Sequence, residues 1–176
     1  MIFEKGEWFF KEKLPDGHYI SYRKKDSTLI SKEVFIKNGK KEGMESRYYF
    51  LNKQKYAEIN WLNGRKNGTE IHYNGNGTIH HLLTFKNDEL NGLCIVNWSE
   101  GAKRYKGFFK NGFRDSVWTY YDNEESRVDS ANYWLSKEYK YHNGKAILIS
   151  AWDKNGMQIV TNGKGVINES GFYPAS

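Results

Sequence analysis

The stretch NGKKEG at residues 38–43 decides the fold, because related copies follow it as NGRKNG at 63–68, NDELNG at 87–92 and NGFRDS at 111–116. The leading asparagines are 25, 24 and 24 residues apart. Asn-Gly is the strongest short signal for a β-hairpin, since both residues accept a positive φ at little energetic cost. A fixed period of this length is typical of repeat proteins. We therefore expect each copy to form one β-hairpin of a repeated array.

The segments between these turns alternate as β-strands do. A bulky apolar residue lies two positions before each leading asparagine, namely Ile36, Trp61, Phe85 and Phe109. Apolar residues at every second position predict an antiparallel sheet that is half-buried on one face. We therefore expect Phe85 and Phe109 to be buried at equivalent places in successive hairpins.

The fold class that follows is all-β: an elongated array of antiparallel β-hairpins of about 24 residues each, in a single open sheet. We expect one repeat domain over residues 1–176. Residues 1–33 read as a degenerate first unit, 34–133 as regular hairpins, and 134–176 as a capping meander with a tail. The turn Asn143-Gly144 belongs to this last part, where terminal repeats are expected to be atypical.

The composition supports a thin β structure. Aromatic residues make up 16% of the chain and hydrophobic residues only 38%, which argues against disorder and against a helical bundle. The single cysteine, Cys94, excludes a disulfide within the chain and a multi-cysteine zinc site. No apolar stretch is long enough to span a membrane, and charges interrupt the N-terminal segment where a signal peptide needs apolar residues. We expect a cytoplasmic location.

The net charge of +6 is spread along the chain. Proteins that bind nucleic acid usually cluster their Lys and Arg residues on one face, so we expect no nucleic-acid partner. The positive charge keeps the protein soluble and favours an acidic partner mildly.

Sequence motifs for catalysis are missing from the chain. It contains no nucleophile elbow, P-loop, HExxH helix or dinucleotide fingerprint, so we expect neither an enzyme nor a cofactor. Adjacent His80 and His81 point to opposite faces of a strand, but either one could face His72 on the neighbouring strand. Two histidines would still need a carboxylate or a thiol to hold a metal, so structural roles are favoured and no metal site is expected. Cys94 lies in an apolar strand and reads as an inert, buried thiol.

Aromatic residues outside the repeat pattern are the candidates for partner binding, because interfaces favour large aromatic anchors. Three of them, Trp98, Phe108 and Trp118, are proposed as anchors. The free face of the sheet is expected to carry mixed charge. Its predicted partner-binding cations are Arg47, Arg104 and Lys106.

The unit "aromatic-x-Asn-Gly-x-x-x-Gly", followed four or five residues later by Tyr, resembles the MORN repeat in its bacterial variant. The chain is similar to the YwqK-like group of bacterial proteins over about residues 30–160, with NWLNGRKNGTEIHYNGNG at 60–77 among the best copies. Asp88 replaces the turn glycine of one copy and Ser116 the closing glycine of another, so we expect altered turns there.

The resemblance implies a ribbon of β-hairpins that binds another protein. For the YwqK-like group it implies an immunity or antitoxin-like protein that neutralises a cognate toxin or effector by covering it. The alternative is a MORN-type scaffold or membrane-surface adaptor that binds another protein or acidic lipid head groups.

Overall fold

The computed structural model describes residues 2–4, 7–9, 14–23, 26–50, 53–123, 133–142 and 145–165, and these residues form strands and turns without a helix. Strands β1 (Ile2–Glu4) and β2 (Glu7–Phe9) pair with each other. The other thirteen strands of the described residues belong to one sheet, in which strand order follows chain order. They are β3 (Gly17–Arg23), β4 (Asp26–Lys37), β5 (Lys40–Tyr48), β6 (Lys55–Leu62), β7 (Arg65–Tyr73), β8 (Ile79–Lys86), β9 (Glu89–Asn97), β10 (Lys103–Lys110), β11 (Phe113–Asn123), β12 (Tyr133–His142), β13 (Lys145–Trp152), β14 (Gln158–Thr161) and β15 (Lys164–Gly165).

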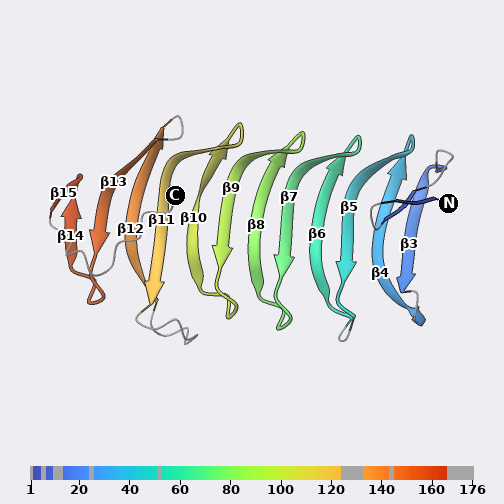
Figure 1. The fold of residues 1–176 in the computed structure, drawn as a ribbon, viewed down its shortest axis with the longest axis horizontal. Helices are drawn as coiled ribbons and strands as arrows, with labels where there is room; N and C mark the ends of the chain where they lie inside the picture. Colours follow the sequence, from blue (N-terminus) through green and yellow to red (C-terminus); the bar gives the residue numbers. More distant parts are fainter. Residues whose placement is uncertain are drawn as a thin grey trace. The chain divides into compact units, whose positions relative to one another are not determined.

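The chain divides into two compact units, Met1–Leu90 (unit 1) and Asn91–Ser176 (unit 2). Within unit 1, strands β3 to β8 pair antiparallel with their chain neighbours, and within unit 2 strands β9 to β15 do the same (Figure 1). The expectation of an all-β array of antiparallel hairpins in an open sheet is confirmed. The expected turn at Asn143-Gly144 lies outside the described residues.

The hairpin turns share one backbone conformation. The leading asparagines Asn38, Asn63, Asn87 and Asn111 have φ between 50° and 53°. The next residue also has a positive φ, 71° at Gly39 and 72° at Asp88. Two consecutive positive φ values are those of a type I′ turn, whose twist matches the strands that it joins. The expectation of an altered turn at Asp88 is therefore wrong: Asp, which tolerates the left-handed region better than most residues, keeps the geometry of the glycine.

A bulge follows each of three turns. In the β10–β11 hairpin, Lys106 pairs with Thr119 and Phe108 pairs with Asp115, so the three residues 116–118 lie opposite Gly107. Ser116 begins this bulge with φ 60°, where other copies have glycine, for example Gly43 at 71°. Corresponding register shifts occur in the β4–β5 and β6–β7 hairpins. The Ser116 copy therefore also keeps the local geometry of its relatives.

One face of the sheet, here called the inner face, carries the core. In unit 1 it includes the buried residues Val34, Ile36, Glu45, Ala57, Ile59 and Glu70. In unit 2 it includes buried Cys94 and Trp118, together with the closely approached Gly107. Phe85 and Phe109 occupy the equivalent strand position in their hairpins, but both are half-buried. A single sheet covers its inner face only with its own long side chains, so burial is incomplete at this position.

Candidate functional site

A buried carboxylate lies at the centre of the β4–β5 hairpin. The side chain of Glu45 is 0% exposed. Its Oε2 atom lies 2.7 Å from Lys41 Nζ, and its Oε1 atom accepts a 2.6 Å hydrogen bond from Arg47 Nε. Burial alone would raise the pKa of Glu45, but the two cations outweigh it and hold the pKa below its ordinary value of 4.5. Glu45 is therefore a charged part of the core that forms ion pairs with two cations.

The next hairpin repeats this arrangement 25 residues later, with Lys66, Glu70 and His72 in place of Lys41, Glu45 and Arg47. Glu70 is paired with Lys66 through Oε2, and its Oε1 atom lies 2.9 Å from His72 Nε2. Burial opposes ionisation, yet the hydrogen bonds from His72 and Lys66 lower the pKa of Glu70 to about 2. The carboxylate is ionised throughout the physiological range.

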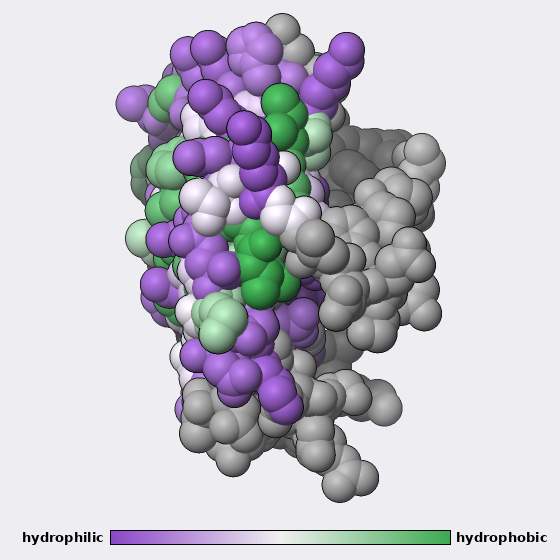
Figure 2. Space-filling view, turned by 90° about the vertical axis from the view of Figure 1, so that its left-hand side faces the viewer, coloured by the Kyte–Doolittle hydropathy of each residue, from purple (hydrophilic) through white to green (hydrophobic). Residues whose placement is uncertain are grey.

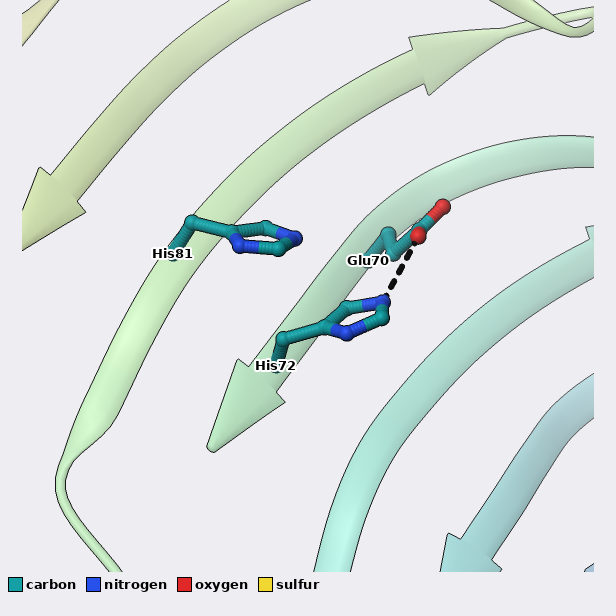
Figure 3. Close-up of side chains that lie close together, drawn as sticks. All are labelled: Glu70, His72 and His81. Atoms are coloured by element: carbon teal, nitrogen blue, oxygen red, sulfur yellow. Dashed lines mark hydrogen bonds and ion pairs between the residues drawn. The ribbon is translucent and has the colours of Figure 1, made fainter. Parts of the chain in front are cut away.

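Two histidines, His72 and His81, lie close to this carboxylate (Figure 3). His72 on β7 is paired in register with His81 on β8, and their rings are stacked with centroids 4.3 Å apart. The ligand atoms of Glu70, His72 and His81 all lie within 4.8 Å of one another. The Nδ1 atom of His81 lies 2.9 Å from His80 Nδ1. Burial, followed by the charges of His72 and His80, lowers the pKa of His81 to about 4, so this imidazole is neutral near pH 7.

The same repeat position in unit 2 is apolar. Cys94 and Trp118 follow Glu70 at intervals of 24 residues, and both are buried. Cys94 is buried, as expected, and burial raises the pKa of its thiol to about 11. Arg114, which is equivalent to Lys66, lies over the Trp118 ring with Cζ 4.5 Å from the centroid.

The structure separates the predicted partner-binding residues into two groups. Trp118 is 0% exposed on the inner face, so its assignment as a surface anchor is wrong. Arg47 lies on the inner face of unit 1, in register with buried Ala57, so its assignment to the free face is also wrong. Its charge pairs with buried Glu45 rather than with solvent. These two residues stabilise the fold.

The other four predicted residues lie together in unit 2. Phe108 is 49% exposed. On β10 the side chains of Arg104, Lys106 and Phe108 alternate with inner-face Gly107 and Phe109, so they share the opposite face, here called the outer face. Arg104 Cζ lies 4.6 Å from the centre of the Trp98 ring, which joins the fourth residue to the group.

Neighbouring strands extend this outer face with more apolar and basic side chains. On β11, Val117 is 40% exposed and pairs in register with Lys140 of β12, which in turn pairs with Ile147 of β13. Ile147 is 64% exposed. The resulting surface has separate apolar side chains set among lysines and arginines. We call it the outer patch, defined by Arg104, Lys106, Phe108, Val117, Lys140 and Ile147.

The surface at the C-terminal edge strands β14 and β15 differs in character from the outer patch. Figure 2 shows an edge that is largely hydrophilic, with small separate hydrophobic areas. Both edge strands are short, and Lys164 lies in the last of them. Short, charged edge strands discourage pairing with further strands. This edge is therefore a poor candidate for strand addition.

Sequence reasoning missed the buried carboxylates Glu45 and Glu70. They share the pattern Lys-x-x-x-Glu-x-Arg/His at the same distance from the turn, and this spacing is the signal that could have found them. It left open whether His80 or His81 faces His72, and it required a carboxylate or a thiol beside them for a metal site. The structure pairs His72 with His81 and places Glu70 beside both.

No known protein-family model and no curated protein sequence matches the chain. In the described residues there is no helix long and apolar enough to cross a membrane.

Proposed function

We propose that this protein is a non-enzymatic binding module of the immunity or antitoxin kind, which neutralises a toxin or effector protein by covering it. The observation that carries the proposal is the outer patch of unit 2. Phe108, Val117 and Ile147 are exposed there although the protein has an inner face on which apolar side chains pack. Exposed apolar groups that gather on one surface are typical of protein-binding sites.

The charge of the outer patch favours an acidic partner. Three of its six members are basic, namely Lys106, Lys140 and Arg104. One acidic residue, Glu138, pairs in register with Thr119, which pairs in turn with Lys106. Basic side chains around apolar anchors speed the encounter with an acidic surface, while the anchors slow dissociation. A standard interface of roughly 1,200–2,000 Å² would extend over several strands of unit 2. The likeness of the repeats to bacterial MORN-variant repeats also supports a binding role.

The test is co-expression with the protein encoded by the neighbouring gene, taken as the candidate toxin or effector, followed by affinity measurement on the purified pair. Replacing Trp98 and Phe108 together by Ala should weaken the complex by more than about 2 kcal/mol, the scale of interface hot spots. Lys106→Glu should slow association in a salt-dependent way. Phe35→Ala, which truncates an exposed aromatic residue in unit 1, is the matched control and should change neither quantity.

The proposal fails if the neighbouring protein is harmless and does not bind, or if the double variant binds as tightly as the wild type. Binding of the chain to vesicles with anionic lipids, lost in Lys106→Glu, would instead support the membrane-surface adaptor.

A further inference from the structure

We propose that Glu70, His72 and His81 bind one divalent transition-metal ion, with Zn²⁺ as the representative case. This site lies in unit 1, in the β6–β7–β8 region, and is independent of the outer patch. Two imidazoles and one carboxylate form a recognised donor set for zinc, with water in the fourth position.

The first argument is the position of the donor atoms. The three ligand atoms lie within 4.8 Å of one another before any metal is bound. Metal–ligand bonds of about 2.0–2.2 Å require donor atoms roughly 3–4 Å apart, so only small movements are needed. The imidazole rings of His72 and His81 can supply these movements by rotation about χ2, which is a broad torsion for histidine. The His72 side chain is 29% exposed, so an ion can reach the site from solvent.

The second argument is the arrangement around the donors. Metal-bound histidines usually use their second ring nitrogen in a hydrogen bond that fixes the tautomer. The contact of His81 Nδ1 with His80 Nδ1 has this role: when His81 donates, its Nε2 atom carries the lone pair for the metal. Glu70 Oε2 is held by Lys66, which leaves Oε1 on the side of His72.

The third argument is a comparison with the preceding hairpin. There the buried carboxylate Glu45 has two permanent cations, Lys41 and Arg47. Arg47 pairs in register with Ala57, just as His72 pairs with His81. The strand pair β7–β8 therefore has two histidines where the strand pair β5–β6 has Arg and Ala. A neutral histidine leaves Glu70 with one permanent cation, and a bound metal ion would supply the positive charge that Arg47 supplies to Glu45.

This comparison also provides the variant for the test. The double substitution His72→Arg and His81→Ala copies the residues of the preceding hairpin, which the same fold accommodates. It removes both imidazoles and restores a cation beside Glu70. His18→Gln, which removes an exposed histidine from β3 of the same unit, is the matched control.

The experiment is calorimetric titration of ZnCl₂ into the full chain near pH 7, with the absorption spectrum of added Co²⁺ as the second readout. We expect one Zn²⁺ per chain and visible Co²⁺ bands in the wild type and in His18→Gln. The double variant should bind at least tenfold more weakly and lack the bands, since loss of a group that merely supports a ligand already costs about 10–100-fold in affinity. Zn²⁺ should also raise the Tm of the wild type and of His18→Gln but not that of the double variant, because a ligand that binds only the folded state stabilises it.

Two results would overturn the proposal: no zinc binding by the wild type, or equal binding by the double variant. Circular dichroism tests whether the double variant is folded. If it is not, His81→Gln is titrated in its place with the same expected loss, and unchanged affinity would again overturn the proposal.

Discussion

The ring of Trp118 occupies the space that a side chain on Gly107 would need, so that a Cβ atom added to Gly107 would overlap the indole. Trp118 Nε1 donates a 3.1 Å hydrogen bond to the carbonyl oxygen of Phe108, and the ring meets Phe109 edge-on with centroids 5.0 Å apart. The indole is therefore held on several sides. This glycine is present because the facing bulge places a tryptophan against the backbone.

Gly107→Ala should consequently lower the free energy of unfolding by about 1–3 kcal/mol or more, the usual cost of overpacking a core. Chemical denaturation followed by tryptophan fluorescence measures it. Gly75→Ala is the matched control, since a Cβ there meets only open space, and it should change stability by less than about 0.5 kcal/mol. In a protein that already carries Trp118→Leu, Gly107→Ala should lower the free energy of unfolding by less than it does in the wild type. Equal stability of the Gly107 and Gly75 variants would contradict this account.

Stability should depend on the ionisation of Glu45. Its pKa is lower in the folded protein than its ordinary value of 4.5, so the folded state favours the carboxylate. The stabilisation is fully present above the pKa of the unfolded chain and is lost as pH falls below 4.5 through the folded pKa. Glu45→Gln should cost about 1–3 kcal/mol near pH 7. The difference from the wild type should decrease in urea titrations at successively lower pH.

Glu89→Gln provides the control for that series, because Glu89 is exposed at the start of β9. The free energy of unfolding of the Glu89→Gln variant should equal that of the wild type at every pH. A Glu45→Gln deficit that stays constant between neutral and acid pH would show that packing, rather than charge, is the function of Glu45.

Asp88 should be sensitive to Ala but not to Asn. Its backbone has φ 72°, and its Oδ1 atom accepts a 2.7 Å hydrogen bond from the backbone N–H of Lys66. The Asp88 N–H donates in turn to the Lys66 carbonyl oxygen at 2.9 Å. Asp88→Ala loses the side-chain acceptor and the tolerance for a left-handed backbone, so thermal unfolding should show a loss of about 1–2 kcal/mol. Asp88→Asn retains both and should stay within about 0.5 kcal/mol of the wild type. The same loss in both variants would argue against the proposed role of Oδ1.

The strands and turns could be predicted from the sequence because both depend on local chemistry. The leading Asn-Gly pairs at 38, 63 and 111 specify type I′ turns, and the alternation in strands such as Lys55–Leu62 specifies which residues share a face. Even the substitution at Asp88 changes nothing, because Asp adopts the same φ as the glycine that it replaces.

The buried position of each hairpin could not be predicted in the same way. It is occupied in turn by Glu45, Glu70, Cys94 and Trp118, which share burial but no chemical property. Trp118 looks like an exception to the aromatic repeat and is for this reason predicted on a surface. Arg47 is predicted on the free face from the alternation alone, and a register shift occurs in its hairpin. Their burial depends on partners from other strands, such as Gly107 for Trp118. The Glu70–His72–His81 cluster likewise forms only when strand register brings β7 and β8 together.

Cys94 should be unreactive in the folded protein. It is 3% exposed, and burial raises the pKa of its thiol to about 11. Because the thiolate is the reactive form, a disulfide reagent near pH 7 should label no thiol in the native chain and one thiol per chain in denaturant. If the Cys94 thiol of the native chain is labelled slowly, and faster as denaturant is added, the labelling rate would measure the local unfolding of unit 2. Rapid stoichiometric labelling of the folded chain would contradict the burial of Cys94.

The neighbours Phe108 and Phe109 should separate folding from binding, because they lie on opposite faces of β10. Phe109 is half-buried against the Trp118 ring, so Phe109→Ala should cost about 2–3 kcal/mol of stability, somewhat less than a fully buried Phe. Phe108 is 49% exposed, and Phe108→Ala should cost less than about 0.5 kcal/mol. Denaturation of both variants measures the stabilities, and affinity for the protein encoded by the neighbouring gene measures binding. We expect Phe108→Ala to weaken the complex while the fold persists, and Phe109→Ala to weaken the fold while the affinity of the remaining folded protein stays close to that of the wild type. Similar stability losses in the two variants would show that the inner and outer faces of β10 have been assigned incorrectly.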